Sequence, residues 1–558
     1  MKIFKDPKFQ FFSLLLIFFI LNFLQSYITL LFEDEAYYYV WSKDLALGYF
    51  DHPPMVALWA AFGQLFFEGE LGVRLLSSLS FSMMIWLIWE MIDFKEKWNH
   101  IFLFFILIIS LAFWQVFGFI MTPDTPLLLF TAVFMLAYKR FLNNDSLFNS
   151  LFLGFAMAGM LYSKYHGILV IIFVVLSNLK LFKNPRFWLA SVFGFVLFVP
   201  HLFWQFENGF PSFLYHLKER NKKPYHIGKT LLHFVNMIAI VGITFPVIYS
   251  AFFKHKASNL FERSLKYIVY GFFVFFLIST FSSEPQAQWV IVVSIPLVII
   301  SFPYLVIQLK ARRWLFVLGS IQLVILLSAR ALFAFPSISP IPLEPHLSTQ
   351  WVPELYKNTE GRPLIFVNNY SEASLYNFYT GVQTHSYSIL KGRKSQYDLL
   401  DFEENMQGMN VYSVSKYESD LPEIASRTGR IYYGKAIDNY YTFEKVKCEI
   451  SGDEIHIVNG LNTIEFTLTN NYKRTIFFDN VDLVGVFQGS KNKILLKVPL
   501  NTEKLNPLEA NEKKTIRADF YISEMPSSEK MTFRAGLDFY QLMEGFQGNK
   551  VKVVIKKN

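Results

Sequence analysis

Long apolar runs fill the first 335 residues, and they constrain more than any other feature how this chain can fold. About 20 apolar residues in a helix cross the hydrocarbon core of a bilayer. The predicted spans are 11–31, 72–92, 100–119, 125–142, 147–162, 166–181, 187–205, 228–253, 265–281, 288–308 and 313–333. Only 17% of the residues are charged, against about 25% in soluble proteins. We therefore predict a polytopic α-helical membrane protein with about eleven spans.

Two of these segments allow a second interpretation. The run from Phe11 to Phe32 could be the core of a signal peptide, but it is long and lacks a small-residue cleavage site, so we predict a transmembrane helix. The segments 147–162 and 166–181 are short and could form one helix through Lys164. We favour two helices, because a lysine at the centre of a bilayer is costly.

Basic residues are distributed unevenly between the predicted loops. Alternate loops carry sixteen Lys and Arg residues in one set and six in the other. The positive-inside rule places the richer set, and with it the N-terminus, in the cytoplasm. An odd number of spans then places residues 340–558 outside the cytoplasm. We predict a multi-pass protein of the inner or plasma membrane, and the net charge of +8 is then no evidence for a nucleic-acid partner.

Three domains are predicted: a transmembrane domain over 1–335, an α/β subdomain over 336–440 and a β-sandwich over 441–558. After a Pro-rich segment, residues 361–381 have the pattern of a strand, a turn and a helix, and 410–429 repeat the strand-then-helix order. The last domain contains alternating runs separated by turn residues, which is typical of a β-sandwich. The single cysteine, Cys448, excludes an intramolecular disulfide.

Polar motifs gather in the loops that are poor in basic residues. The first of these loops starts with Glu33-Asp34-Glu35 and continues with an amphipathic stretch. Pro53 and Pro54 then begin a second short helix, because proline suits the first turn of a helix. We expect two helices that lie along the membrane surface. Since the other motifs fall in loops on the same side, we predict one site built from loops and helix ends.

These motifs, in this order, closely resemble the polyprenol-phosphate-dependent glycosyltransferases of the GT-C fold. That group includes protein O-mannosyltransferases and the bacterial aminoarabinose transferase that modifies lipid A. The likeness extends over roughly residues 10–335. It is carried by Asp34-Glu35-Ala36-Tyr37-Tyr38, Gly48-Tyr49-Phe50-Asp51-His52-Pro53-Pro54, Gly72-Val73-Arg74-Leu75, Thr122-Pro123-Asp124, Ser163-Lys164-Tyr165-His166-Gly167 and Gln286-Ala287-Gln288-Trp289.

The resemblance implies a reaction and assigns the acids. A hydroxyl or amine of the acceptor attacks the anomeric carbon of a lipid-linked sugar, and the lipid phosphate leaves. Asp34, at the end of the first span, is implied to be the base, with Asp124 as a second carboxylate of the site and Glu35 as a helper or structural partner. A base must lie about 3 Å from the atom it deprotonates. No metal is needed for this chemistry, because the phosphate is itself the leaving group.

Cations on the same side are expected to stabilise the leaving phosphate. The candidates are His52, Arg74, Lys164 and Arg220, with His216 as a further cation in the same loops. The aminoarabinose transferase commonly has a lysine before Pro-Pro, so the histidine at position 52 makes this contact less secure and dependent on pH. Tyr37, Gln288 and Trp289 are expected to line the donor pocket.

Each of these residues also has a structural interpretation. Asp34 and Glu35 could stabilise a helix N-terminus, Asp124 could be an N-cap, and Lys164 could extend to the membrane interface. Arg74 and Arg220 could bind lipid headgroups. Trp289 could belong to the interfacial aromatic belt. Asp51, beside His52, and the distant His216 raise the alternative of a structural divalent metal site, without a defining spacing.

The favoured function is an inverting transfer of a monosaccharide from a polyprenyl-phosphate donor to lipid A, another envelope glycolipid or a glycan. Protein Ser and Thr side chains are the second acceptor class. A lipid-linked sugar transporter is the main alternative of a different kind, but transporters usually contain inverted repeats and broken helices at the bilayer centre. An inactive scaffold that displays the β-sandwich is disfavoured by the presence of Asp34, Asp124 and Lys164.

Overall fold

The computed structural model describes residues 6–219, 224–417, 421–427, 429–490, 493–526 and 530–556. The chain divides into two compact units, Met1–His346 and Leu347–Asn558, here called the helical unit and the C-terminal unit. The helix α17 (Glu344–Asn358) runs across the boundary between them.

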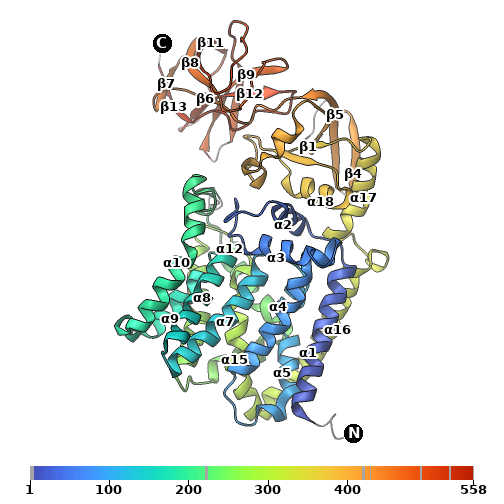
Figure 1. Ribbon diagram of the computed structural model, residues 1–558, viewed down its shortest axis with the longest axis vertical. Helices are drawn as coiled ribbons and strands as arrows, with labels where there is room; N and C mark the ends of the chain where they lie inside the picture. The colour runs from blue at the N-terminus through green and yellow to red at the C-terminus, as the bar shows by residue number, and fades with distance from the viewer. Residues whose placement is uncertain are drawn as a thin grey trace. The chain divides into compact units, whose positions relative to one another are not determined.

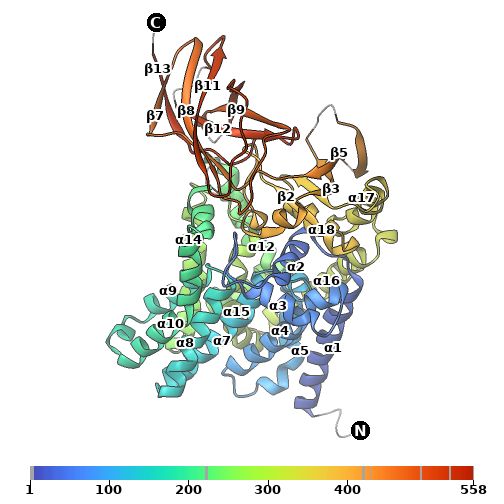
Figure 2. The same cartoon turned by 45° about the horizontal axis from the view of Figure 1, so that its top comes forward.

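The helical unit is built from helices that follow the predicted spans. Its α-helices before α17 are α1 (Pro7–Ile28), α2 (Glu33–Lys43), α3 (Met55–Gln64), α4 (Gly69–Met91), α5 (Ile101–Ile109), α6 (Trp114–Phe117), α7 (Asp124–Asn143), α8 (Leu147–Ser163), α9 (Gly167–Ser177), α10 (Pro185–Glu207), α11 (Pro211–Leu214), α12 (Ile227–Val241), α13 (Phe245–Lys254), α14 (Leu260–Ser279), α15 (Ser294–Ile307) and α16 (Leu309–Ala334). Shorter helical turns are η2 (Lys97–His100), η3 (Leu179–Lys183), η4 (Tyr215–Glu219), η5 (Gly242–Thr244), η6 (Ala287–Val293) and η7 (Pro336–Ile338). Figures 1 and 2 show α2 and α3 lying across one end of the bundle.

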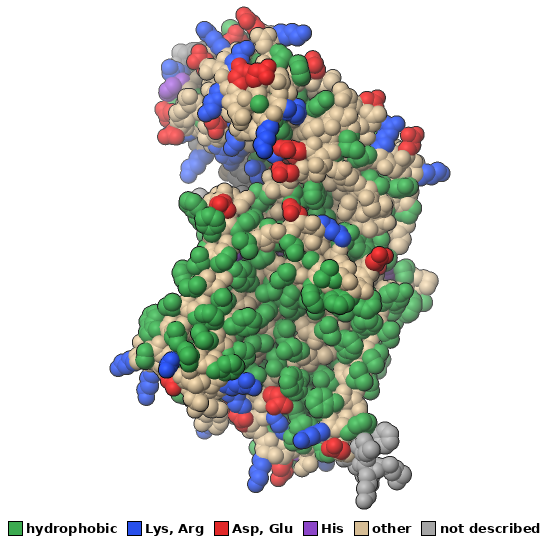
Figure 3. Space-filling model, viewed as in Figure 1, with side chains coloured by type: hydrophobic (Ala, Val, Ile, Leu, Met, Phe, Trp, Pro, Cys, Tyr) green, Lys and Arg blue, Asp and Glu red, His purple; other side chains and the backbone are tan. Residues whose placement is uncertain are grey.

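The apolar character of these helices makes the chain a polytopic membrane protein. Within the described residues, seven helical segments are long and apolar enough to cross a membrane. In the apolar window of the continuous segment Ala287–Ile307, formed by η6 and α15, 83% of the residues are buried, against 22% in α16, so this segment is central and α16 peripheral. Figure 3 shows a broad apolar surface over the flank of the bundle, with charged side chains at the end where α1 begins. The predicted pair of helices around Lys164 is present as α8 and α9.

Two predicted spans are interrupted, which the sequence pattern did not indicate. The span over 100–119 breaks after α5, and the Ser110 carbonyl accepts hydrogen bonds from Gln322 Nε2 at 2.7 Å and Thr244 Oγ1 at 3.4 Å. The span over 228–253 is interrupted at Gly242, which has a φ of 61°. A break is tolerated inside a membrane protein when side chains satisfy the freed backbone groups, as these do.

The C-terminal unit contains three sheets. A five-stranded sheet has the order β2-β1-β3-β5-β4, in which β1 pairs in parallel with β2 and β3. A second five-stranded sheet has the order β10-β9-β12-β13-β7, and a three-stranded sheet the order β11-β8-β6. The strands are β1 (Leu364–Val367), β2 (Thr384–Tyr387), β3 (Met409–Ser415), β4 (Glu423–Arg427), β5 (Arg430–Tyr440), β6 (Val446–Glu449), β7 (Glu454–Ile457), β8 (Gly460–Asn470), β9 (Val481–Gln488), β10 (Ile494–Pro499), β11 (Lys513–Ile522), β12 (Thr532–Phe539) and β13 (Val551–Ile555).

The last two sheets pack face to face as a sandwich. Residues alternate between buried and exposed along β8 and β11, as expected for strands with one face on a core. The ring of Phe520 on β11 lies 6.3 Å from Phe487 on β9 and 5.7 Å from Phe533 on β12. These aromatic contacts join the two sheets, and the predicted β-rich C-terminal region is confirmed.

One helix predicted in this unit is wrong. The first sheet does contain the predicted order of β1 followed by α18 (Tyr370–Thr380), and the short turns η8 (Gln396–Leu399) and η9 (Asp401–Met406) precede β3. The segment after β3, however, forms the strand β4, which pairs antiparallel with β5. Pro422 precedes this strand and disfavours a helix through the segment, and β5 offers an unpaired edge that the strand completes.

Candidate functional site

A buried ion pair fixes the start of α2, the helix that carries the acidic motif. Glu35 and Arg74 are both fully buried. Arg74 Nε donates to Glu35 Oε1 at 2.7 Å, and a terminal guanidinium nitrogen donates to Oε2. Glu35 also accepts from the backbone N–H groups of Phe32 at 3.1 Å and Met121 at 2.8 Å. The pair therefore joins α2 to α4 and to the segment before α7.

Arg74 has no N–H group left for a ligand in this arrangement. Its remaining donors reach the backbone carbonyls of Ser26, Thr29 and Leu30, at the end of α1. Together with the two bonds to Glu35 these contacts use all five guanidinium donors. Breaking a buried pair of this kind is costly, so the contacts predicted for Arg74 with phosphate would require a rearrangement of three helices.

Asp34 lies beside this pair but differs from it in exposure. It is an exposed residue in the first turn of α2, next to the buried Glu35. Three acids occupy this first turn, where the positive end of the helix dipole favours them. The hydrogen bond from Met121 to Glu35 holds the turn close to the segment that leads into Asp124. Tyr37, one turn further along α2, is buried and packs edge-on against Trp41 at 4.9 Å.

The second buried ion pair joins Asp124 to Lys164. Lys164 Nζ contacts both carboxylate oxygens of Asp124, at 2.8 and 2.7 Å, and both side chains are almost fully buried. Asp124 is the first residue of α7, and the N-cap is Pro123, so the predicted alternative of an N-cap aspartate is wrong. Lys164 directly follows α8 and does not extend to solvent. A lysine and a carboxylate are thus held together at the same ends of two packed helices.

A network of polar side chains anchors the loop between α2 and α3, and the sequence analysis did not identify it. His201 on α10 contacts the Tyr165 hydroxyl at 2.9 Å and the Leu47 carbonyl at 2.7 Å. Ser212 donates to the Tyr49 carbonyl at 2.7 Å and accepts from Gln205 Nε2 at 2.8 Å. The loop that carries the Asp51–Pro54 motif is therefore fixed onto α10 and α11.

His52 and His216 meet across this loop. Their ring centroids lie 5.8 Å apart, and His216 Nε2 lies 2.8 Å from the backbone carbonyl of Asp51. Among the described residues no group of three or more His, Cys, Asp or Glu side chains is arranged to hold a metal ion. The predicted metal site at Asp51 and His216 thus has no third ligand in the described part of the chain.

The remaining predicted residues are divided between this end of the helical unit and the undescribed segment. Trp289 is buried, and its ring lies 5.4 Å from that of His166, two residues after Lys164. Gln288 is half-buried and donates to Gln286 Oε1 at 2.9 Å. Arg220 lies outside the described residues.

Glu344 was missed because it belongs to the Pro-rich segment before residues 361–381, where the sequence analysis assigned no functional residue. Its carboxylate accepts from the backbone N–H of Glu33 at 3.1 Å, at the N-terminus of α2. The residue as a whole is exposed, but its carboxyl group is surrounded by protein atoms. This burial, together with the nearby carboxylates of Glu33, Asp34 and Glu35, raises the pKa of Glu344 to about 6. A titratable group therefore adjoins the predicted base.

Arg330 was missed because it lies inside a predicted span. It is buried on α16, where its guanidinium donates to the Gln115 carbonyl at 3.1 Å and to Asn22 Oδ1. It also lies 5.3 Å from the centroid of the Phe119 ring, which Arg74 approaches to 6.0 Å. An ionisable side chain in a membrane helix usually faces the protein interior, and here it ties α16 to α1 and α6.

Comparison with known proteins finds a family model and solved structures that are similar to this chain. Residues 51–204 match a family model described as dolichyl-phosphate-mannose-protein mannosyltransferase. Among solved structures, ArnT from Cupriavidus metallidurans in the apo state is similar, with a TM-score of 0.56, 14% sequence identity, and coverage of 76% of this chain and 97% of ArnT. ArnT bound to undecaprenyl phosphate gives a TM-score of 0.54 with the same identity and coverage. No curated protein sequence matches the chain significantly.

The predicted resemblance is confirmed by these comparisons. The chain has the GT-C fold, and its family match extends from the Asp51–Pro54 motif into α10. Together the family match and the shared fold indicate a multi-pass membrane glycosyltransferase. The roles of individual residues are considered next.

Proposed function

We propose that this glycosyltransferase moves a monosaccharide from a polyprenyl-phosphate carrier to an envelope glycolipid or glycan on the non-cytoplasmic face of the cell membrane. The observation that carries the proposal is the buried Asp124–Lys164 pair, linked by Glu35 and Met121 to the acidic turn of α2. The matched family is named for a dolichyl-phosphate sugar donor, and ArnT was solved with undecaprenyl phosphate. Both support a lipid-phosphate donor.

The proposed reaction is a single displacement. Asp34 accepts the proton of the acceptor hydroxyl or amine, whose lone pair forms the new bond to the anomeric carbon. The bond from that carbon to the phosphate oxygen breaks, its electrons remain on the phosphate, and the configuration inverts. The Lys164 ammonium group and the His52 ring provide hydrogen-bond donors at the phosphate, where charge develops. Gln288 and Trp289 line the donor site.

The two buried pairs have different proposed roles. Asp124 holds Lys164 and offsets the cost of burying its ammonium group, which is proposed to contact the phosphate. Glu35 and Arg74 act as positioning residues, because their hydrogen bonds are used within the protein. They set the direction of the first turn of α2, and hence of Asp34. No metal ion takes part in the proposed step.

A second acceptor class follows from the matched family. Its description names proteins as the substrates of mannosyl transfer, which supports Ser and Thr hydroxyls as alternative acceptors. The orientation is proposed from the charge pattern: sixteen basic residues lie in the loops with the N-terminus, and six lie in the loops with the acidic motifs.

The donor class can be tested with purified protein in proteoliposomes. Radiolabelled sugar is supplied either on undecaprenyl phosphate or on a nucleotide diphosphate, with lipid A, a membrane glycan fraction or a Ser/Thr-rich peptide as acceptor. We expect label to leave only the undecaprenyl carrier and to appear on one acceptor class. Use of the nucleotide sugar alone would contradict the proposal. Transfer to the peptide alone would select the second acceptor class.

Glu344→Gln is expected to change the pH dependence of transfer. Above its pKa of about 6, Glu344 is ionised, and a negative charge beside Asp34 favours proton uptake by that base. As the pH falls through about 6, Glu344 becomes protonated and no longer favours proton uptake by Asp34. The decrease of kcat/KM at acid pH therefore becomes steeper. The glutamine variant should have a lower plateau and an acid limb displaced to lower pH. Identical profiles for the two proteins would exclude this role, and Glu68→Gln, an exposed acid before α4, serves as the control.

A further inference from the structure

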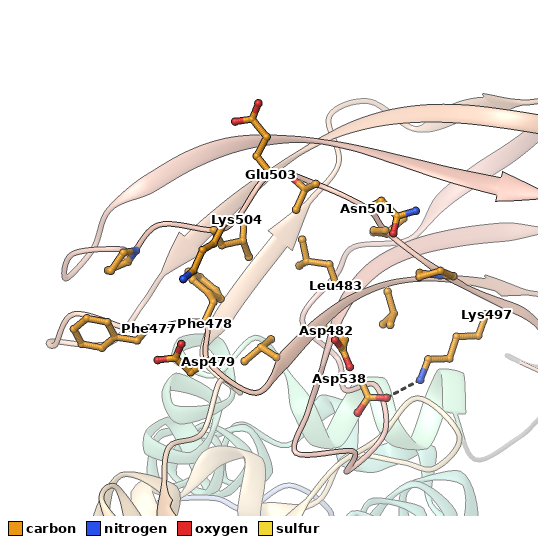
Figure 4. A pocket seen from close by; sticks show the side chains of 17 residues that line it. Phe477, Phe478, Asp479, Asp482, Leu483, Lys497, Asn501, Glu503, Lys504 and Asp538 are labelled. Carbon is orange, nitrogen blue, oxygen red and sulfur yellow. Dashed lines mark hydrogen bonds and ion pairs between the residues drawn. The ribbon is translucent and has the colours of Figure 1, made fainter.

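A cleft of about 800 Å³ opens on the β-sandwich, and none of its lining residues belongs to the candidate functional site described above. It lies between the start of β9 and the segment that follows β10, as Figure 4 shows. Small-molecule sites typically measure about 300–1,000 Å³. The cleft is therefore large enough for more than one sugar unit, and all of its lining residues belong to the C-terminal unit.

Apolar groups form one part of the cleft. The ring of Phe477 is 60% exposed at its rim, so its face is available to a bound molecule. Phe478 beside it is held by stacking on Phe443 at 6.1 Å. Leu483 and Leu500 are buried beneath the opening. A ligand with a flat face of C–H groups would pack on this surface.

Polar groups without protein partners form the other part. The carboxylates of Asp479 and Asp482 and the amide of Asn501 make no hydrogen bond or ion pair among the described residues. Lys497, in contrast, is held by Asp538 at 2.6 Å and Glu544 at 3.1 Å. Figure 4 shows the Asp538 carboxylate directed toward Lys497, and the Glu503 carboxylate directed away from them. The unpartnered carboxylates can accept hydrogen bonds from hydroxyl or ammonium groups.

The charge of the lining selects between ligands. Four acids, Asp479, Asp482, Glu503 and Asp538, face two lysines, Lys497 and Lys504. An excess of fixed negative charge repels phosphorylated or carboxylated ligands and accepts uncharged or cationic ones. An apolar ring next to hydrogen-bond acceptors matches a saccharide, which presents C–H groups on one face and hydroxyl groups at its edge.

We propose that this cleft is a glycan-binding site for an uncharged or amine-bearing oligosaccharide, and that it holds the acceptor or product glycan of the enzyme. The assignment to the acceptor rests on the proposed function, whereas saccharide binding itself does not. A second binding site in the same chain raises the effective concentration of a bound acceptor. Loss of the cleft should therefore raise KM for a glycan acceptor and leave kcat unchanged.

Binding can be measured on the full-length protein in nanodiscs by isothermal titration calorimetry. The probes are three pentasaccharides that differ in charge: of N-acetylglucosamine (uncharged), of glucosamine (cationic) and of galacturonic acid (anionic). We expect the first two to bind and the third not to bind. Phe477→Ala and Asp482→Asn should each weaken the binding of the uncharged probe roughly tenfold. Tyr521→Ala removes another exposed aromatic ring of the sandwich, 66% exposed on β11, and should leave the affinity unchanged.

The outcomes separate this proposal from the transferase proposal. Asp34→Asn should bind the uncharged probe as the wild type does, since Asp34 belongs to the helical unit. Binding without any sugar transfer would contradict the proposed enzyme activity and retain the glycan site. The proposal of a glycan-binding site is overturned if neither the uncharged nor the cationic probe binds, or if the anionic probe binds as tightly as the uncharged one. It is also overturned if Phe477→Ala and Asp482→Asn bind the uncharged probe as tightly as the wild type.

Discussion

Asp34→Asn is expected to lower kcat for sugar transfer by about 10²–10⁴-fold, the usual contribution of a positioned general base. The substitution removes a proton acceptor but keeps the size of the side chain. Because Asp34 is exposed in the first turn of α2, its replacement should leave the fold and the affinity for undecaprenyl phosphate intact. The measurement is single-turnover transfer from the labelled donor, with size-exclusion profile and melting temperature recorded for each variant.

Two variants make this test specific. Asp34→Glu keeps the carboxylate and should recover part of the rate. Asp44→Asn removes another exposed acid, at the opposite end of α2, and should transfer at the wild-type rate. If Asp34→Asn transfers at the wild-type rate, another group is the base and the central assignment fails.

Arg74→Met is expected to lower the free energy of unfolding by about 3–5 kcal/mol, because it leaves the Glu35 carboxylate buried without its cation. The same loss is expected for Glu35→Leu, which leaves the guanidinium unpaired. The double variant should recover much of the loss, since replacing both members of a buried pair by apolar groups removes both desolvated charges. Reversible denaturation in detergent micelles measures all three values.

An exposed ion pair provides the control for this cycle. Lys139 and Asp93 meet at 2.6 Å, with side chains 14% and 61% exposed. Removing Asp93 should cost only about 0–1 kcal/mol, as is usual for surface pairs. If the losses at Glu35 and Arg74 are equally small, or add without coupling in the double variant, the pair does not hold α2 as inferred.

Much of the fold is predictable because apolar runs in a membrane chain are a strong local signal. The start of α7 near Asp124, the separation of α8 from α9 at Lys164 and the short helices α2 and α3 all follow from nearby residues. The break after Ser110 cannot be predicted from nearby residues, because it depends on Gln322, more than 200 positions away. β4 also escaped prediction, since its pairing with β5 overrides the helical propensity of its residues.

The site was predictable to a different extent for each residue. The acids and cations could be named from motifs, and their placement on one side could be expected from the alternation of loops. The partner of each charge could not be predicted from the sequence. The ion pairs of Glu35 with Arg74 and of Asp124 with Lys164 depend on tertiary packing. Glu344 and Arg330 carry no local motif and meet their partners across about 300 residues of sequence, so only the structure could reveal them.

A structure of the full-length protein in nanodiscs with undecaprenyl phosphate, determined by electron cryo-microscopy, tests the central claim most directly. We predict that the lipid phosphate lies within hydrogen-bonding distance of Lys164 Nζ, at the end of the helical unit that carries Asp34 and Asp124. A phosphate bound at the opposite end of the helical unit, beside Lys95 or Arg186, would contradict the account.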